Sequence, residues 1–272
     1  MDTLQPDPIL QARLPEVPWR LPHGGKLPGT LPVVEGDWLR FDDAYGAQMA
    51  LRDRLIDQQR DAVHAMLSAA LPAAREALDA VLEVLRGRDD FDVGPDVVRR
   101  PDGVDIALDR DQPLISIGRL IQDDLCLIEK PQGAAEHILS AAILCFPASW
   151  MLSEKIGRPL VMIHEPITSY TTDVATRVQR LFDGVRVGRP LWRMNLLRYE
   201  DPALFQPRSQ DARRDKPRGH AAYARSERQC LVRLPETNAM IFSIHTSVVR
   251  CDAMDPAEVA ALDAYLDGLE DT

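Results

Sequence analysis

Apolar side chains recur every three or four residues in two segments near the N-terminus, residues 43–67 and 72–87. This spacing places them on one face of an α-helix. Pro72 suits the first position of the second helix, where its missing N–H is not needed, and Gly87 is suited to end that helix. The two segments therefore predict an antiparallel helical hairpin within residues 41–88.

The middle and the C-terminal third of the chain contain apolar runs typical of β-strands. Gln122-Asp123-Asp124 has the composition of a hairpin turn between two of them, and residues 235–238 have that of another. The expected strands are residues 114–121, 125–129, 137–146, 160–163, 191–199, 226–234 and 239–249.

Three further segments predict helices. Ser149 can cap a short helix that ends near Gly157, and an amphipathic pattern covers residues 174–184. Asp255-Pro256-Ala257-Glu258 has the composition of a helix start, and apolar spacing continues to Leu269. Strands interrupted by helices without regular βαβ alternation favour an α+β fold around an antiparallel sheet.

The N-terminal segment, residues 1–40, is rich in proline and is expected to form an extended arm. Trp19, Leu21 and Trp38 are its expected anchors on the rest of the chain. Residues 41–272 are then expected to form a single domain, because 272 residues suffice for one large domain with a substantial core.

Charge and composition exclude several functions. The net charge of −10 argues against nucleic-acid binding, which needs clustered cations. No apolar run reaches the roughly 18 residues needed to cross a bilayer, so no membrane association is expected. The four cysteines form no C-x-x-C pair, which favours a reducing, cytoplasmic location. There is also no G-x-G-x-x-G, Walker, H-E-x-x-H or G-x-S-x-G motif. Any redox chemistry would thus require a tightly held prosthetic group and an outside source of electrons.

The run Val161–Ile167 places a histidine, His164, two residues before Pro166 at the end of an expected strand. Neutral histidine is the commonest metal-binding side chain, so His164 is a candidate ligand of iron or zinc. For a single such histidine, a buried imidazole bonded to a backbone carbonyl is the commoner arrangement.

Four segments taken together resemble one family, the heme-dependent oxidative N-demethylases of the heme-binding alpha subunit type. The segments are Cys145-Phe146-Pro147-Ala148-Ser149-Trp150, Ile163-His164-Glu165-Pro166, Trp192-Arg193-Met194-Asn195, and Ser226–Pro235 continuing into Ile241-Phe242-Ser243-Ile244-His245-Thr246. The E-R-Q-x-L-x-R-L-P string within residues 227–235 is the most specific part. The resemblance also includes Asp37-Trp38 and Ala47-Gln48-Met49, and so covers most of the chain.

This resemblance implies heme b, with its iron, in a PAS-like antiparallel sheet fold. It also implies O2-dependent removal of a methyl group from a small alkylamine such as dimethylamine, which releases formaldehyde. The sequence departs from the expected pattern at Pro166-Ile167-Thr168, at Leu196, where tryptophan is expected, and at His245, where arginine is expected. These departures concern the substrate and the pocket more than the fold.

With this resemblance, His164 becomes the candidate axial ligand of the iron. Cys145 is the alternative, since a thiolate ligand favours oxygen activation, although its apolar neighbours suit a buried, inert thiol. His137 and His245 are candidates for a distal group or a second ligand, or they make ordinary polar contacts.

Arginines in the expected strands are candidates to neutralise the heme propionates, because a guanidinium pairs with a carboxylate through two hydrogen bonds. Alternation along a strand places Arg228 on one face and Arg233 on the other, together with Glu227. Arg193, in the tryptophan-bearing strand, is a comparable candidate. The alternative for each is a solvated sheet face.

Recognition of an alkylammonium substrate needs a carboxylate or an aromatic wall. Glu227 is the candidate carboxylate, and Tyr170, six residues after His164, is a candidate proton donor. The aromatic residues that could supply the wall are Trp192, Tyr199 and Tyr223.

The favoured function is therefore a heme monooxygenase that demethylates a small amine and receives electrons from a separate reductase. A heme-containing PAS-type sensor of gas or redox state without turnover is the alternative. A scaffold subunit of an oxidase that has lost its heme is a third interpretation.

Overall fold

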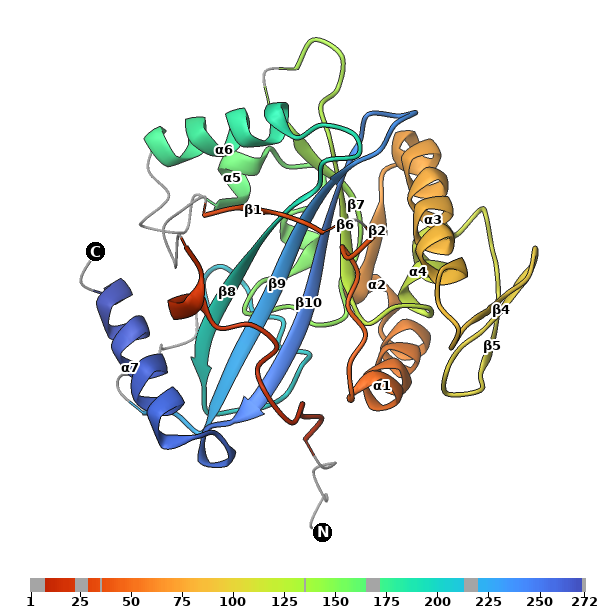
Figure 1. Ribbon diagram of the computed structural model, residues 1–272. Coiled ribbons are helices and arrows are strands. Elements are labelled where there is room, and N and C mark those ends of the chain that lie inside the picture. Colours follow the sequence, from red (N-terminus) through yellow and green to blue (C-terminus); the bar gives the residue numbers. More distant parts are fainter. Residues whose placement is uncertain are drawn as a thin grey trace.

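The computed structural model describes residues 8–22, 29–34, 36–134, 136–164, 172–212 and 220–270. Within these ranges, seven strands form one large antiparallel sheet in the order β1-β8-β9-β10-β6-β7-β2 (Figure 1). The strands are β1 (Leu31–Pro32), β2 (His64–Met66), β6 (Asp124–Glu129), β7 (Ile138–Ile143), β8 (Leu191–Tyr199), β9 (Tyr223–Arg233) and β10 (Met240–Arg250). The predicted α+β class is confirmed, as are the strands expected near residues 125–129, 137–146, 191–199, 226–234 and 239–249.

Seven α-helices are described around this sheet. They are α1 (Tyr45–Gln58), α2 (Arg60–Val63), α3 (Leu71–Arg86), α4 (Pro113–Gly118), α5 (Leu160–His164), α6 (Thr172–Gly184) and α7 (Pro256–Glu270). Short 3-10 turns are η1 (Pro18–Arg20), η2 (Ser68–Ala70), η3 (Leu152–Glu154) and η4 (Cys251–Ala253). The helix predicted after Ser149 is thus only the turn η3, whereas α3, α6 and α7 lie where the sequence predicts helices.

Different helices cover the two faces of the large sheet. Cys230 and Ile241 pack with buried side chains of α3 and α4, and we call this side the α3 face. Leu231 and Met240, each one residue away along the same strands, pack with α5 and α6 on the other side, the α6 face. Because successive side chains of a strand alternate between faces, the central residues of β9 and β10 can be assigned to one of these two environments. Tyr223 and Val248, near the far ends of these strands, pack with the main core instead.

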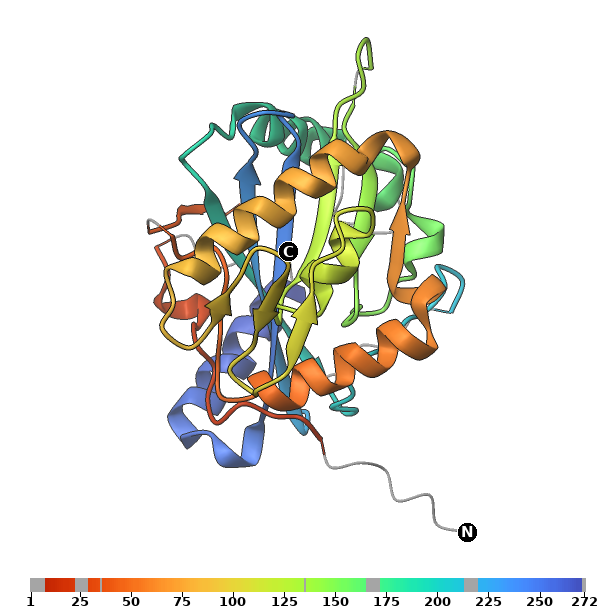
Figure 2. The same ribbon diagram turned by 90° about the vertical axis from the view of Figure 1, so that its right-hand side faces the viewer.

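A second, three-stranded sheet lies outside α1 and α3. It consists of β3 (Asp92–Val93), β4 (Val97–Arg99) and β5 (Asp105–Ala107), and Figure 2 shows it in front of the large sheet together with the two helices. Val98 and Ile106 from this small sheet are buried in the same cluster as α3. The sequence predicted only a connection here, because strands of two or three residues leave no clear alternation.

Two expected strands are helices in the structure. Residues 114–121 contain α4, so the hairpin predicted at residues 122–124 does not form. Pro113 occupies the start of α4, and the helix approaches β7 so closely at Gly118 that an added Cβ would lie 2.6 Å from an Ile143 side-chain carbon. Residues 160–164 form α5 rather than the expected strand.

The predicted helical hairpin is interrupted. Both α1 and α3 form near their predicted positions, but α2 and β2 lie between them, and β2 pairs with β7 at the edge of the large sheet. The connection is therefore part of the sheet rather than a simple turn.

The described part of the N-terminal arm lies along the sheet. Its strand β1 pairs with β8, and Trp38 is buried in the main core. Trp19 and Leu21 pack with α7 and with Met194 of β8, on the α3 face. These three expected anchors are confirmed.

Candidate functional site

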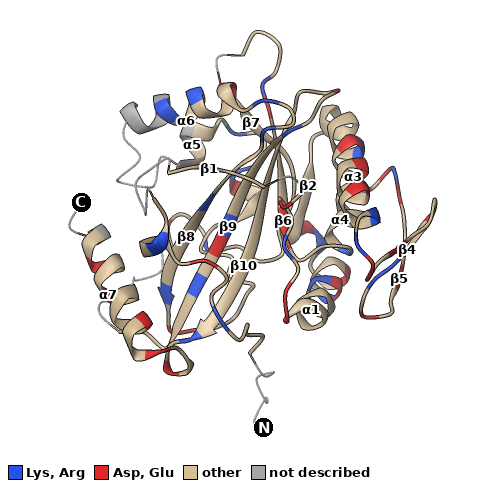
Figure 3. Cartoon of the chain, in the orientation of Figure 1, with Lys and Arg blue, Asp and Glu red and all other residues tan. Residues whose placement is uncertain are grey.

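A connected row of polar side chains crosses β8 and β9 on the α6 face. The Arg193 Nη1 group donates to Gln229 Oε1 at 2.8 Å, and Gln229 Nε2 donates to Glu227 Oε2 at 3.3 Å. On the other side, the Arg225 Nε atom lies 3.4 Å from Glu227 Oε1. Figure 3 shows both acidic and basic residues along β9. We call these four residues, Arg193, Gln229, Glu227 and Arg225, the polar row.

Burial sets the electrostatics of the polar row. Glu227 and Arg225 are only 6% and 1% exposed. Burial lowers the pKa of Arg193, although the nearby Glu227 carboxylate partly opposes this effect. A guanidinium in such surroundings favours an additional anion, because desolvation penalises its isolated charge.

Thr246 of β10 extends this polar region to a third strand. It lies directly opposite Glu227 in the antiparallel register, and Asn195 of β8 lies opposite Glu227 on the other side. Thr246 is fully buried, and its Oγ1 atom has no hydrogen-bond partner among the residues that the structure describes. Buried hydroxyl groups normally have a partner, so an unpaired one at this position marks a place where a ligand could bind.

Apolar side chains border the polar row at its α5 end. Leu160 of α5 and Phe182 of α6 pack with Leu231 and Ile244 of the sheet. This cluster places apolar side chains directly beside the polar row, and ligand sites combine these two kinds of lining.

A strained loop borders the opposite end of the row. Arg225 Nη2 donates to the carbonyl oxygen of Phe146 at 2.6 Å, and Nη1 donates to that of Leu204 at 3.2 Å. In the same loop, Ser149 has φ = 67°, a left-handed conformation that non-glycine residues rarely adopt. Within the described ranges, its buried Oγ atom also has no hydrogen-bond partner. Backbone strain of this kind clusters at functional sites, which supports placing the site beside this loop.

The helix α5 brings the backbone of His164 to the α6 face. Ile163 packs in the cluster of that face, and its carbonyl oxygen accepts a hydrogen bond of 2.8 Å from Lys155 Nζ. Lys155 is only 4% exposed, so a buried cation stabilises the C-terminal end of α5. His164 is the last residue of this helix. The His164 side chain and residues 165–171, which include Tyr170, lie outside the described residues.

Arg228 lies on the α3 face, away from the polar row. Its Nη2 group donates to the carbonyl oxygen of Asp37 at 2.8 Å, and its guanidinium lies 5.0 Å from the ring centre of Trp192. These contacts attach the N-terminal arm to the sheet. The alternation predicted for Arg228 and Arg233 is confirmed by the register.

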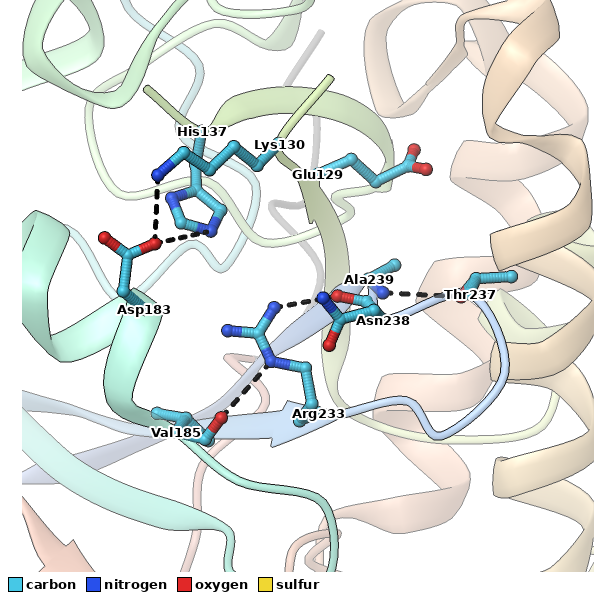
Figure 4. A pocket seen from close by; sticks show the side chains of 9 residues that line it. All are labelled: Glu129, Lys130, His137, Asp183, Val185, Arg233, Thr237, Asn238 and Ala239. Carbon is cyan, nitrogen blue, oxygen red and sulfur yellow. Dashed lines mark hydrogen bonds and ion pairs between the residues drawn. The ribbon is translucent and has the colours of Figure 1, made fainter. Parts of the chain in front are cut away.

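Arg233 shares the α6 face with Glu227, as predicted, but it lies beyond the apolar cluster. It donates to the carbonyl oxygens of Asn238 at 2.7 Å, of Val185 at 3.3 Å and of Phe182. It therefore holds the end of α6 against the β9–β10 turn. Arg233 lines a cleft of about 200 Å³ together with Lys130, whose ammonium group pairs with Asp183 (Figure 4).

The two other candidate histidines, His137 and His245, lie outside the polar row. His137 lines the Arg233 cleft and contacts Gln179 at 3.0 Å. His245 lies on the α3 face between Asp42 and Asp123, at 2.9 and 3.2 Å. Burial lowers the pKa of His245, but hydrogen bonds and charge from the two aspartates outweigh it and raise the pKa to about 9. His245 thus supplies a positive charge where the resemblance led us to expect arginine.

The rival ligand Cys145 lies in the main core cluster rather than in the apolar cluster of the α6 face. It is fully buried in the core under α3, and burial raises the pKa of its thiol to about 12. A thiolate is the form that binds metals, and such a thiol stays protonated near neutral pH.

The match to a protein-family model identifies the chain. The model for haem-dependent oxidative N-demethylase, alpha subunit-like, matches residues 32–272. The chain belongs to this family. The description of the family implies an oxidative, heme-dependent enzyme, so the α6 face can be tested as a heme site.

The residues of the α6 face fit this family's cofactor in three respects. An apolar wall and a half-buried arginine, Arg193, lie side by side on one sheet face, and α5 ends at a histidine. Over the residues that the structure describes, no group of three or more His, Cys, Asp or Glu is arranged to hold a metal ion. Heme iron needs only one or two protein ligands, so a single imidazole is sufficient. No helix in the described ranges is long and apolar enough to span a membrane.

Sequence reasoning about this family's motifs missed three polar residues of the site. Arg225 precedes the E-R-Q string by two positions, and Gln229 and Thr246 were not assigned roles. The alternation of β9 placed Gln229 beside Glu227, and the same rule could have found Arg225. The position of Thr246 depends on the register between β9 and β10, which no local pattern reveals.

Proposed function

We propose that the chain is a heme-dependent N-demethylase that acts with O2 on a small secondary alkylamine such as dimethylamine and releases formaldehyde. The observation that carries this proposal is the buried polar row, in which Glu227 and Arg193 are linked through Gln229 on the α6 face. Membership of the family supports the oxidative, heme-dependent chemistry. The group we propose is heme b in a PAS-like domain, with electrons supplied by a separate reductase.

Two residues of this face would hold the heme. His164, at the end of α5, would ligate the iron, and Arg193 would pair with a propionate, because burial disfavours its unpaired charge. When bound, the heme would supply the activation of oxygen. Arg228 and Arg233 are committed to the arm and to the end of α6, so Arg193 is the preferred partner for the propionate.

Glu227 would orient the amine. Alkylamines are protonated at neutral pH, and a buried carboxylate is a strong acceptor for an ammonium N–H. Arg225 and Gln229 hold the carboxylate from both sides, which limits its rotation. The apolar cluster around Ile244 would exclude water from the methyl groups. Tyr170, which follows α5 in the sequence, remains our candidate proton donor.

The overall reaction balances as a monooxygenation. One oxygen atom of O2 is inserted into a methyl C–H bond to give a carbinolamine, and the other leaves as water with two protons and two electrons from the reductase. The carbinolamine then breaks its C–N bond, transfers the hydroxyl proton to nitrogen, and yields formaldehyde and the amine that has lost one methyl group.

Formaldehyde release tests this proposal. Heme-loaded protein is incubated with dimethylamine, O2 and an electron donor, and formaldehyde and oxygen consumption are measured together. We expect equal amounts of formaldehyde formed and amine consumed, and a large loss of turnover in Glu227→Gln. Heme uptake without amine-dependent oxygen consumption would instead favour the sensor.

A further inference from the structure

We infer that Thr246 is a second hydrogen-bond acceptor for the substrate ammonium, and that together with Glu227 it selects secondary amines over tertiary and quaternary ones. This inference rests on the proposed function, because it assigns a substrate class to the same face. The two residues lie on neighbouring strands, β9 and β10.

The register places the two acceptors side by side. Glu227 and Thr246 are directly opposite one another in antiparallel strands, and both side chains lie on the α6 face. Side chains in such a pair have Cβ atoms about 4.5–5.5 Å apart. One small ligand can therefore contact both side chains.

The hydroxyl of Thr246 has no competing partner among the described residues. Thr246 is 0% exposed, and its Oγ1 atom makes no hydrogen bond within that part of the chain, although its backbone carbonyl accepts from Gln48 Nε2 at 3.0 Å. A buried hydroxyl without a partner is destabilising, so its position directly opposite Glu227 points to a partner that binds from outside the chain.

The chemistry of the two acceptors matches a secondary ammonium. Such a cation carries two N–H groups, of which one can bond to the Glu227 carboxylate and the other to Thr246 Oγ1. Its two alkyl groups need apolar contact, and Ile244, two residues before Thr246, shares its face and is buried. A tertiary ammonium has one N–H and a quaternary ammonium has none, so each leaves at least one acceptor unpaired.

The same strand supplies a matched control. Ser247 is also buried and its hydroxyl also has no hydrogen-bond partner in the described part of the chain, but strand alternation places it on the α3 face. Ser247→Ala therefore removes a similar group from β10 without changing the α6 face.

Calorimetric titration of heme-loaded protein with dimethylammonium, trimethylammonium and tetramethylammonium chloride tests the inference. We expect affinity to fall in that order. Thr246→Val, which keeps the shape and loses the hydroxyl, should weaken dimethylammonium binding roughly tenfold and change trimethylammonium binding less than twofold. Thr246→Ser should restore most of the dimethylammonium affinity, and Ser247→Ala should change neither.

Equal loss for both amines in Thr246→Val, or no loss, would overturn the inference, as would a wild-type protein that binds no amine. The titration can fail independently of the formaldehyde assay, so the role of Thr246 and the proposed demethylation are tested separately. Selective binding without formaldehyde release would refute demethylation alone, whereas turnover with unchanged selectivity in Thr246→Val would refute the role of Thr246 alone.

Discussion

Arg193 of β8 and Glu227 of β9 are joined through one side chain, Gln229, which accepts from the arginine and donates to the carboxylate. The amide of Gln229 can do both because its oxygen accepts and its nitrogen donates. The two opposite charges are thus held apart rather than paired directly. Arg193 therefore keeps the capacity to bind an anion, and Glu227, which faces only the Arg225 guanidinium at 3.4 Å, receives no second positive charge from Arg193.

Arg193→Gln should lower heme affinity about tenfold, because a charge-assisted hydrogen bond to a propionate is lost. Arg228→Gln is the matched control, since Arg228 lies on the other face of the sheet and should leave heme affinity within about twofold. Hemin titration followed by absorbance measures both. Equal losses in the two variants would show that Arg193 has no special role.

Arg233→Met should destabilise the protein by about 2–4 kcal/mol, because a buried guanidinium that bonds to three carbonyl oxygens is removed. Denaturant unfolding measures the change. Heme affinity, measured well below the unfolding transition, should remain near that of the wild type. A stable variant that no longer binds heme would instead identify Arg233 as a cofactor residue.

His245 should make stability depend on alkaline pH. Its folded-state pKa of about 9 is above the ordinary value near 6.5. The stabilisation is therefore complete below about pH 6.5 and is lost as pH rises through 9, by about 3 kcal/mol in total. Unfolding free energies at pH 6, 7.5 and 9 should show this fall in the wild type and a much flatter profile in His245→Gln. A wild-type profile as flat as that of the variant would contradict the assignment.

Asp124→Asn should destabilise the fold by about 3–5 kcal/mol. Asp124 is fully buried, pairs with Arg52 at 2.7 Å, and accepts the backbone N–H groups of Cys145 and Phe146. The substitution leaves a buried guanidinium without its counter-charge. Asp57→Asn is the control, since Asp57 is exposed where it pairs with Arg119 and should contribute less than about 1 kcal/mol. Similar unfolding midpoints for both variants would refute this difference.

The long strands could be predicted from sequence because their strand-like segments are long and are bounded by turn residues. Residues 191–199, 226–234 and 239–249 lie within or nearly coincide with β8, β9 and β10. Alternation along the strand then correctly separated Arg228 from Arg233. Short apolar segments could not be assigned in this way, because a buried helix and a buried strand look alike over five to eight residues.

The segments containing α4 and α5 show this limit. Leu114, Ile117 and Ile121 are all fully buried in the structure. The segment therefore lacks the regular alternation of apolar and polar residues by which an amphipathic helix is recognised in a sequence. Tertiary packing against β7 decided the outcome for α4. The candidate site was predictable only where alternation applied, at Glu227 and Gln229, while the loop around Ser149 and the pairing with Thr246 depend on the assembled fold.

Hemin titration of purified wild-type protein and of His164→Ala, followed in the Soret region, tests the central claim most directly. His137→Ala is the control, because His137 lies in the separate Arg233 cleft. We expect one heme per chain in the wild type and in His137→Ala, and a shifted Soret band with strongly reduced affinity in His164→Ala. A His164→Ala variant with the wild-type band and stoichiometry, or a wild-type protein that takes up no hemin, would contradict the account.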